Sequence, residues 1–123
     1  MQKNKWNKEE RRITMTEELV TLETAELLKE KGFSGRKYII DVSTLPHCYN
    51  FLSVPPQSIA QKWLRETKNL HIEIPYMYGN YWIYDILTIP NHDLVGLSNR
   101  PIIHYNTYEE ALEAGLQEAL KLI

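Results

Sequence analysis

The residues best suited to chemistry lie in two short polar segments of the chain. His47 and Cys48 are adjacent in a region bounded by prolines, and His92 is followed directly by Asp93. An imidazole or a thiolate in such a segment can act as a base, a nucleophile or a metal ligand. Adjacent residues of an extended segment point apart, however, so His47 and Cys48 do not form a nucleophile–base pair by themselves. A small enzyme with a site near His47, Cys48 and His92 is therefore an alternative prediction and not the leading one.

Metal and nucleotide chemistry lack the sequence patterns that they need. A structural zinc site takes four Cys or His ligands at characteristic spacings, whereas this chain has one cysteine and no Cys-x-x-Cys or His-x-x-x-His pair. The five glycines never gather into a phosphate-binding loop. The run Asn91-His92-Asp93 consists of residues that favour turns. We therefore predict no catalytic residue, no metal and no cofactor.

The strongest functional signal is an aromatic cluster. Its members are Tyr76, Met77, Tyr78, Tyr81, Trp82 and Tyr84. Such residues pack across a hairpin, or they bind a protein partner or a second copy, because Tyr and Trp are enriched at interface hot spots. Base stacking is disfavoured, since residues 70–89 include no Lys or Arg to attract phosphate. The cluster is our candidate interaction surface.

A predicted β-hairpin over residues 70–89 must position this cluster. Gly79-Asn80 suits a two-residue turn, which places Ile72 opposite Leu87. In that register the core face carries Leu70, Ile72, Ile74, Tyr76, Ile83, Leu87 and Ile89. The outer face carries His71, Glu73, Met77, Trp82, Tyr84, Ile86 and Thr88. A three-residue loop would invert one strand, and so aromatic an outer face requires either a covering helix or a partner.

Three amphipathic segments predict helices at 22–31, 57–68 and 107–123. Thr21 is placed to cap the first helix, and Gly32 follows it as a C-terminal glycine. In the last helix, Thr107 and Glu110 form a capping box. Gly115 inside that helix costs about 1 kcal/mol relative to alanine, so we expect close packing there.

The remaining segments complete a predicted α+β fold. Short strands are expected at 37–42, 49–52 and 102–105, and residues 90–100 are expected to form a loop. The predicted architecture is an antiparallel sheet of three to four strands with three helices packed on it, an αβ sandwich.

Composition favours one soluble domain in the cytoplasm. The chain has 123 residues, 43% of them hydrophobic, and no apolar run approaches the roughly 20 residues that span a bilayer. A single cysteine, Cys48, favours a reducing compartment. We predict a flexible basic tail over residues 1–15 and a single domain over residues 16–123. Residues 1–12 hold five basic and two acidic side chains, a net of +3, which leaves −5 on the rest because the total is −2.

Two further interpretations concern this tail. Met15 begins a stretch that looks like a natural protein start, so either Met1 or Met15 is the first residue of the native protein. Nucleic-acid binding through the basic tail is a second alternative function, although the negative body of the chain repels phosphate.

Three stretches carry a resemblance: Thr16–Ala25 continuing to Phe33, Gln57–Glu66, and Thr107–Leu116. They resemble small uncharacterised proteins that recur in gut anaerobes, their prophages and mobile elements. The order of a helix, a Trp-bearing strand and a closing Tyr-Glu-Glu-Ala-Leu helix is also similar to the phage ABA-sandwich domain. The resemblance implies a phage-type or mobile-element accessory protein, with oligomerisation as an expectation, and transfers no functional residue. Our leading prediction is a non-enzymatic protein that acts by protein–protein interaction or self-association, without membrane or nucleic-acid partners.

Overall fold

The computed structural model describes residues 17–35, 38–41, 51–98 and 103–123 of the chain. The elements in that part are α2 (Leu22–Glu30), β1 (Ile39–Asp41), β2 (Phe51–Ser53), α3 (Gln57–Thr67), β3 (Leu70–Glu73), β4 (Tyr76–Met77), β5 (Tyr81–Trp82), β6 (Asp85–Thr88), β7 (Leu94–Leu97) and α4 (Tyr108–Leu122). All strand pairs are antiparallel, and the predicted α+β fold is confirmed. The predicted tail over residues 1–15, with Met15, lies outside the described residues.

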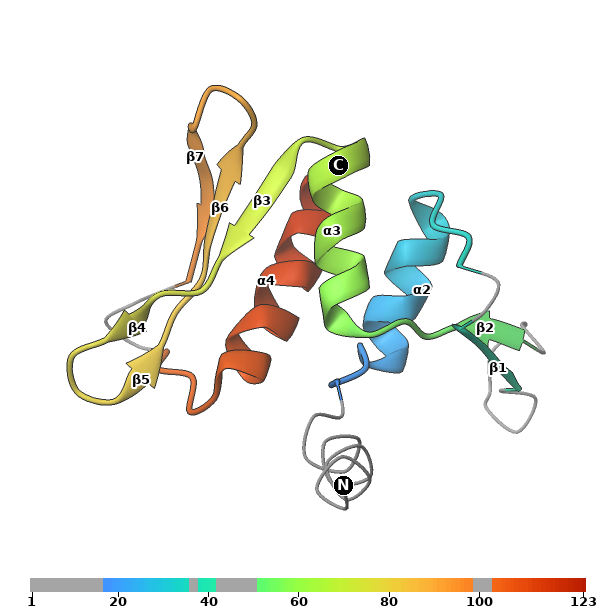
Figure 1. The fold of residues 1–123 in the computed structure, drawn as a ribbon, viewed down its shortest axis with the longest axis horizontal. Helices are drawn as coiled ribbons and strands as arrows, with labels where there is room; N and C mark the ends of the chain where they lie inside the picture. Colours follow the sequence, from blue (N-terminus) through green and yellow to red (C-terminus); the bar gives the residue numbers. More distant parts are fainter. Residues whose placement is uncertain (1–16, 36–37, 42–50, 99–102) are drawn as a thin grey trace, which may run out of the picture.

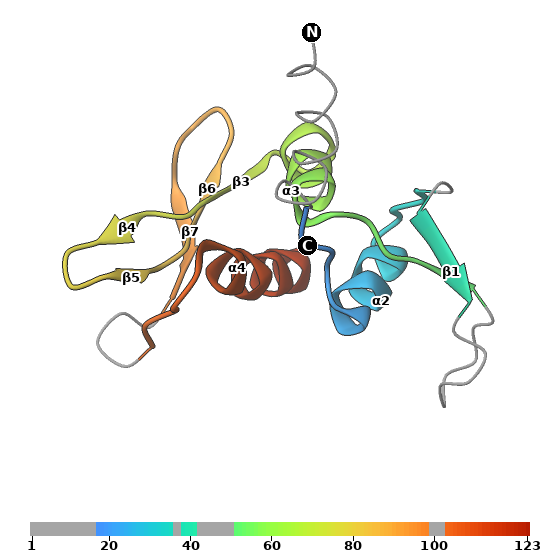
Figure 2. The same cartoon turned by 60° about the horizontal axis from the view of Figure 1, so that its bottom comes forward.

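The elements are arranged in layers, which Figures 1 and 2 show from two sides. The three-stranded sheet has the order β3-β6-β7, and α3 and α4 pack against one of its faces. On the other side of α4 lies α2, which in turn contacts β2 of the small β1–β2 hairpin. The core sits between these layers and is formed by Leu28, Leu64, Ile72, Ile86, Leu116 and Leu120.

Both predicted helix caps are present. The Thr21 hydroxyl accepts a hydrogen bond from the Thr24 N–H, and Thr107 does the same for the Glu110 N–H at 3.1 Å. Gly32 follows α2 with a φ of 104°, in the left-handed region that glycine adopts without strain. These ends were predictable because each depends on residues only a few positions apart.

The register of the 70–89 hairpin differs from the prediction by one residue. Met77 pairs with Tyr81, so three residues form the loop, and Asn80 adopts a φ of 66°. The same register continues into β3 and β6, where Ile72 faces Ile86 instead of Leu87. A three-residue loop inverts the second strand relative to a two-residue turn.

This inversion changes which residues of the second strand face the helices. Tyr84 and Ile86, predicted on the outer face, are part of the core cluster together with Leu70 and Ile72 of the first strand. Ile83 and Leu87, predicted in the core, are also buried, but Tyr76 and Ile89 are exposed, contrary to their predicted place on the core face. The predicted faces were therefore correct for β3, whereas on β6 the prediction holds for the burial of Leu87 and is wrong for Ile86.

Strand β7 lies in a segment that was predicted to be a loop. A turn over residues 89–91 reverses the chain, and Leu94–Leu97 then pairs with β6, with a register shift between Ile86 and Leu87. Gly96 allows the close approach, because a Cβ there would lie 2.9 Å from Ile86 Cδ1. The four-residue strand contains this glycine and follows Pro90 and Asn91, which obscured it in the sequence.

One carboxylate joins the three helices. Glu113 of α4 accepts hydrogen bonds from the Thr21 N–H at 3.0 Å, from the Thr21 hydroxyl at 2.8 Å and from the Thr24 hydroxyl, all at the start of α2. Its other oxygen accepts from Gln57 Nε2, the first residue of α3, at 2.9 Å. Thr24 and Gln57 are both buried, so the bonds to Glu113 help to satisfy polar groups that folding removes from water.

We expect Glu113→Gln to lower the free energy of unfolding by about 1–3 kcal/mol, because its amide N–H₂ group would face the N–H and O–H groups that now donate to the carboxylate. Urea unfolding followed by circular dichroism measures the change. Glu66→Gln is the matched control: Glu66 is exposed on α3, and its replacement should change stability by no more than about 0.5 kcal/mol. Equal effects of the two variants would contradict the role assigned to Glu113.

We expect Gly115→Ala to destabilise the protein although alanine is the better helix former. A Cβ at this position would lie 2.9 Å from Ile72 Cγ2 and 3.2 Å from Tyr84 Cβ. Overpacking of this kind costs about 1–3 kcal/mol, which outweighs the gain of about 1 kcal/mol in helix propensity. The same urea titration measures the difference. A more stable variant would contradict this prediction, because it would show that Ile72 and Tyr84 move aside at little cost.

Candidate interaction surface

The far end of the hairpin forms an aromatic surface, which we call the aromatic tip. It is defined by Tyr76, Tyr78, Tyr81, Trp82, His104 and Tyr108. β4 and β5 carry Tyr76, Tyr81 and Trp82, and Tyr78 lies in the loop between the two strands. The segment before α4 then pairs with the other side of β5, through the two hydrogen bonds between Trp82 and Tyr105. The tip is thus held from two sides of β5.

Trp82 is the centre of the aromatic tip. Its ring lies 4.8 Å from the ring of Tyr76, the residue opposite it on β4. On another side it meets Tyr108, the first residue of α4, edge to face at 5.5 Å. Trp82 is therefore half-buried and joins the hairpin to the start of α4. Aromatic pairs at such distances and angles are stabilising.

The outer members of the tip are open to solvent. The ring of Tyr81 stacks on His104 at 3.7 Å, and the Tyr76 hydroxyl donates to Asn80 Oδ1. Tyr76 is 56% exposed, and Tyr78 in the loop is fully exposed. The aromatic tip thus combines rings that pack on one another with one fully exposed tyrosine, a combination typical of surfaces that bind another protein.

Five of the six predicted surface residues lie at this end of the hairpin, and Met77 is half-buried among them. Tyr84 is the exception, because it is only 6% exposed and packs under α4. Its hydroxyl donates to Glu118 of α4. Burial raises the pKa of the Tyr84 phenol well above its ordinary value of 10.0, and the hydrogen bond to Glu118 raises it further. Tyr84 is therefore a core residue and not part of the surface.

His104 and Tyr108 were missed as members of this surface. Tyr108 was predicted as part of the helix at 107–123, and His104 as part of the strand at 102–105. No short-range pattern connects either residue with Tyr81 and Trp82, more than twenty positions earlier in the chain. Their place depends on the pairing of Tyr105 with Trp82.

The structure does not assemble the predicted alternative catalytic site. His92 is exposed in the turn between β6 and β7, where its backbone N–H donates to Thr88 O at 2.8 Å. Its side chain has no hydrogen-bonded partner among the described residues. His47 and Cys48 lie outside the described residues, so their place in the alternative remains a prediction. In the described part of the chain, no three Cys, His, Asp or Glu side chains gather as a metal ion would need.

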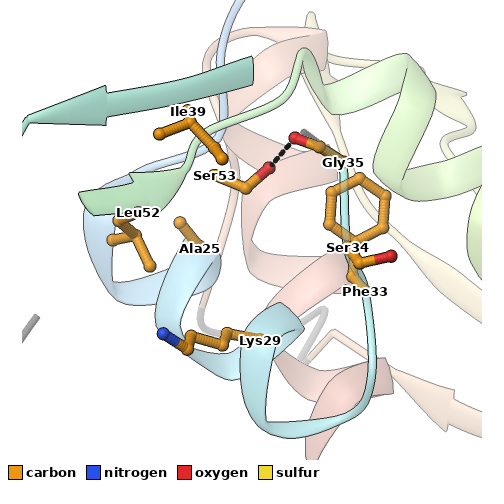
Figure 3. Close-up of a pocket in the computed structure, with 8 residues that line it drawn as sticks. All are labelled: Ala25, Lys29, Phe33, Ser34, Gly35, Ile39, Leu52 and Ser53. Atoms are coloured by element: carbon orange, nitrogen blue, oxygen red, sulfur yellow. Dashed lines mark hydrogen bonds between the residues drawn. The ribbon is translucent and has the colours of Figure 1, made fainter. Parts of the chain in front are cut away.

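A second feature is a small hollow between α2 and the β1–β2 hairpin, shown in Figure 3. It has a volume of about 210 Å³, and its lining consists of Ala25, Lys29, Phe33, Ser34, Gly35, Ile39, Leu52 and Ser53. The Ser53 hydroxyl donates to Gly35 O at 2.7 Å, across the hollow's edge. These lining residues include no His, Cys, Asp or Glu, and the Ser53 hydroxyl is engaged by Gly35 O.

No protein-family model, no curated protein and no solved structure matches this chain. Among the described residues, no helix is both long and apolar enough to cross a membrane. The evidence for function therefore comes from the surfaces of the chain itself.

Stability should fall as the pH rises through about 10, and Tyr84 should contribute to that fall. The buried phenol keeps its proton in the folded state, whereas in the unfolded chain it ionises near its ordinary pKa of 10.0. Tyr84 thus contributes stability that is fully present below this pH and is lost above it. We expect Tyr84→Phe to reduce the slope of unfolding free energy against pH between about pH 9 and about pH 11.

The matched control is Tyr78→Phe, which alters a fully exposed tyrosine and should leave the slope unchanged. Tyr105, whose pKa is also raised, first by burial and then by Glu118, keeps part of the slope in both variants. Identical slopes for wild type and Tyr84→Phe would contradict the assignment.

Proposed function

We propose that the protein acts without catalysis, by binding a partner protein through the aromatic tip. The observation that carries the proposal is the fully exposed Tyr78 at the end of a hairpin whose neighbouring rings are already fixed. Fixed aromatic side chains lose little conformational entropy on binding. The partner that fits is a protein with an apolar, uncharged patch.

Charge supports a protein over a nucleic acid as the partner of the tip. Residues 76–84 include no Asp, Glu, Lys or Arg. An uncharged aromatic surface is cheap to remove from water, and it has nothing with which to attract a phosphate backbone. Nucleic-acid binding through the basic tail, the second alternative, concerns residues outside the described part of the chain.

The setting of this function follows from the sequence resemblance. We extend the proposal to an accessory protein of a phage or mobile element that works in the cytoplasm, where its one cysteine stays reduced. A small enzyme near His47, Cys48 and His92 receives less support, because His92 is an exposed turn residue without a hydrogen-bonded side chain.

Co-purification with the full-length chain tests the proposal. Tyr78→Ser removes the exposed ring without disturbing a packed contact. Leu19→Ser is the control, because Leu19 is 53% exposed just before α2, a helix that lies far from β4 and β5 in Figure 1. We expect a protein that the wild type and Leu19→Ser retain and Tyr78→Ser loses. With that partner purified, Tyr78→Ser should raise Kd about tenfold or more. Retention of the same proteins by all three chains, or by none, would contradict the proposal.

A further inference from the structure

The aromatic tip has two different faces. Tyr76 of β4 lies directly opposite Trp82 of β5, so their side chains point to the same side of the hairpin. Met77 lies opposite Tyr81, and this pair points to the other side. Tyr108 of α4 contacts the Trp82 ring. The first face therefore carries a row of three rings, Tyr76, Trp82 and Tyr108, which we call the aromatic row.

The rings of the aromatic row are inclined to one another. The plane of Trp82 makes an angle of 55° with that of Tyr76 and of 84° with that of Tyr108. Inclined rings leave angular notches between them, not the flat platform on which a sugar ring stacks. Because the two outer ring centres lie 4.8 Å and 5.5 Å from that of Trp82, they are at most about 10 Å apart, close to the rise of about 9 Å for one turn of polyproline II helix.

The polar atoms of the aromatic row are available to donate hydrogen bonds. Among the described residues, neither Trp82 Nε1–H nor the Tyr108 hydroxyl has a hydrogen-bond partner. Residues 76–84 include no carboxylate, and their one side-chain amide oxygen, Asn80 Oδ1, already accepts from the Tyr76 hydroxyl. The side chains of the row therefore favour a ligand that is rich in hydrogen-bond acceptors.

We propose that the aromatic row binds a proline-rich segment of the partner protein in the polyproline II conformation. This inference rests on the proposed function and names the chemistry of the partner. Proline has no N–H, and a polyproline II helix has no internal hydrogen bonds, so its carbonyl groups are free to accept from Trp82 and Tyr108. Its pyrrolidine rings are apolar and uncharged, and they dock between aromatic side chains.

Charge and hydrogen bonding favour a proline-rich segment over other ligands. A charged peptide would find no ion pair in residues 76–84, which include no charged side chain. A sugar requires acceptors for its hydroxyl groups, and the row offers mainly donors. A helix uses its own carbonyl groups internally, so it would leave Trp82 Nε1–H without an acceptor. A polyproline II segment is also extended before it binds, so it loses little entropy on a small surface.

Nuclear magnetic resonance of the ¹⁵N-labelled full chain tests the proposal with a decaproline peptide. The chain has three tryptophans and therefore three indole N–H signals, and the signal that disappears in Trp82→Phe is that of Trp82. We expect decaproline to move this signal saturably at concentrations up to about 1 mM. The signal of Trp63, which packs on Phe33, should stay in place. A Gly-Ser peptide of equal length should move neither signal.

Tyr108→Leu and Tyr81→Leu form a matched pair of variants. Tyr108→Leu keeps an apolar side chain at the start of α4 but removes a ring and a hydroxyl from the aromatic row, so we expect it to raise the Kd of decaproline about fivefold or more. Tyr81→Leu makes the same change on the opposite face of the hairpin and should leave this Kd unchanged. An unmoved Trp63 signal in both variants reports an intact fold.

An unmoved Trp82 signal, an equal movement by the Gly-Ser peptide, or equal weakening by the two variants overturns the proposal. Movement by cellohexaose and not by decaproline assigns the row to a sugar and overturns it as well. If decaproline does not bind while Tyr78→Ser still loses a protein partner, only this inference fails. If decaproline binds while Tyr78→Ser retains every protein, the proposed function fails and the chemistry of the row stands.

Discussion

The carboxylate of Glu113 is the interaction on which the arrangement of the helices depends. The first turn of a helix has N–H groups without partners and a partial positive charge, and both favour an anion. At α2 that anion comes from α4, while Thr21 supplies the local cap. Because the other oxygen of Glu113 holds Gln57, one side chain relates the starts of α2 and α3 to the middle of α4. The buried polar groups around it make any other spacing of the helices costly.

The position of α4 then determines which surfaces remain open. Two glycines allow α4 and the sheet to approach closely: Gly115 on the helix, opposite Ile72 and Tyr84, and Gly96 on β7, next to Glu118. The Tyr84 hydroxyl donates a hydrogen bond to the same Glu118, which links the sheet to α4 at this point. Helices α3 and α4 lie on one face of the sheet, and Gln61 of α3 donates a hydrogen bond to Ile72 O of β3. The aromatic tip and the side chains of Leu94, Val95 and Leu97 stay exposed to solvent.

The sequence was informative where structure is local and misleading where it is not. Helix ends at Thr21, Gly32 and Thr107 depend on neighbouring residues, and all three agree with the prediction. The hairpin faces depended on one loop, and a third loop residue was enough to move Tyr84 from the surface to the core. β7 and the stacking of His104 on Tyr81 depend on contacts between distant segments, which periodicity does not encode.

The aromatic tip is accessible because it forms the end of one continuous hairpin. β3 pairs with β6 and β4 with β5 in the same register, so the tip projects beyond the strands that β7 joins. A partner can therefore reach Tyr78 at the loop without displacing any strand of the β3-β6-β7 sheet.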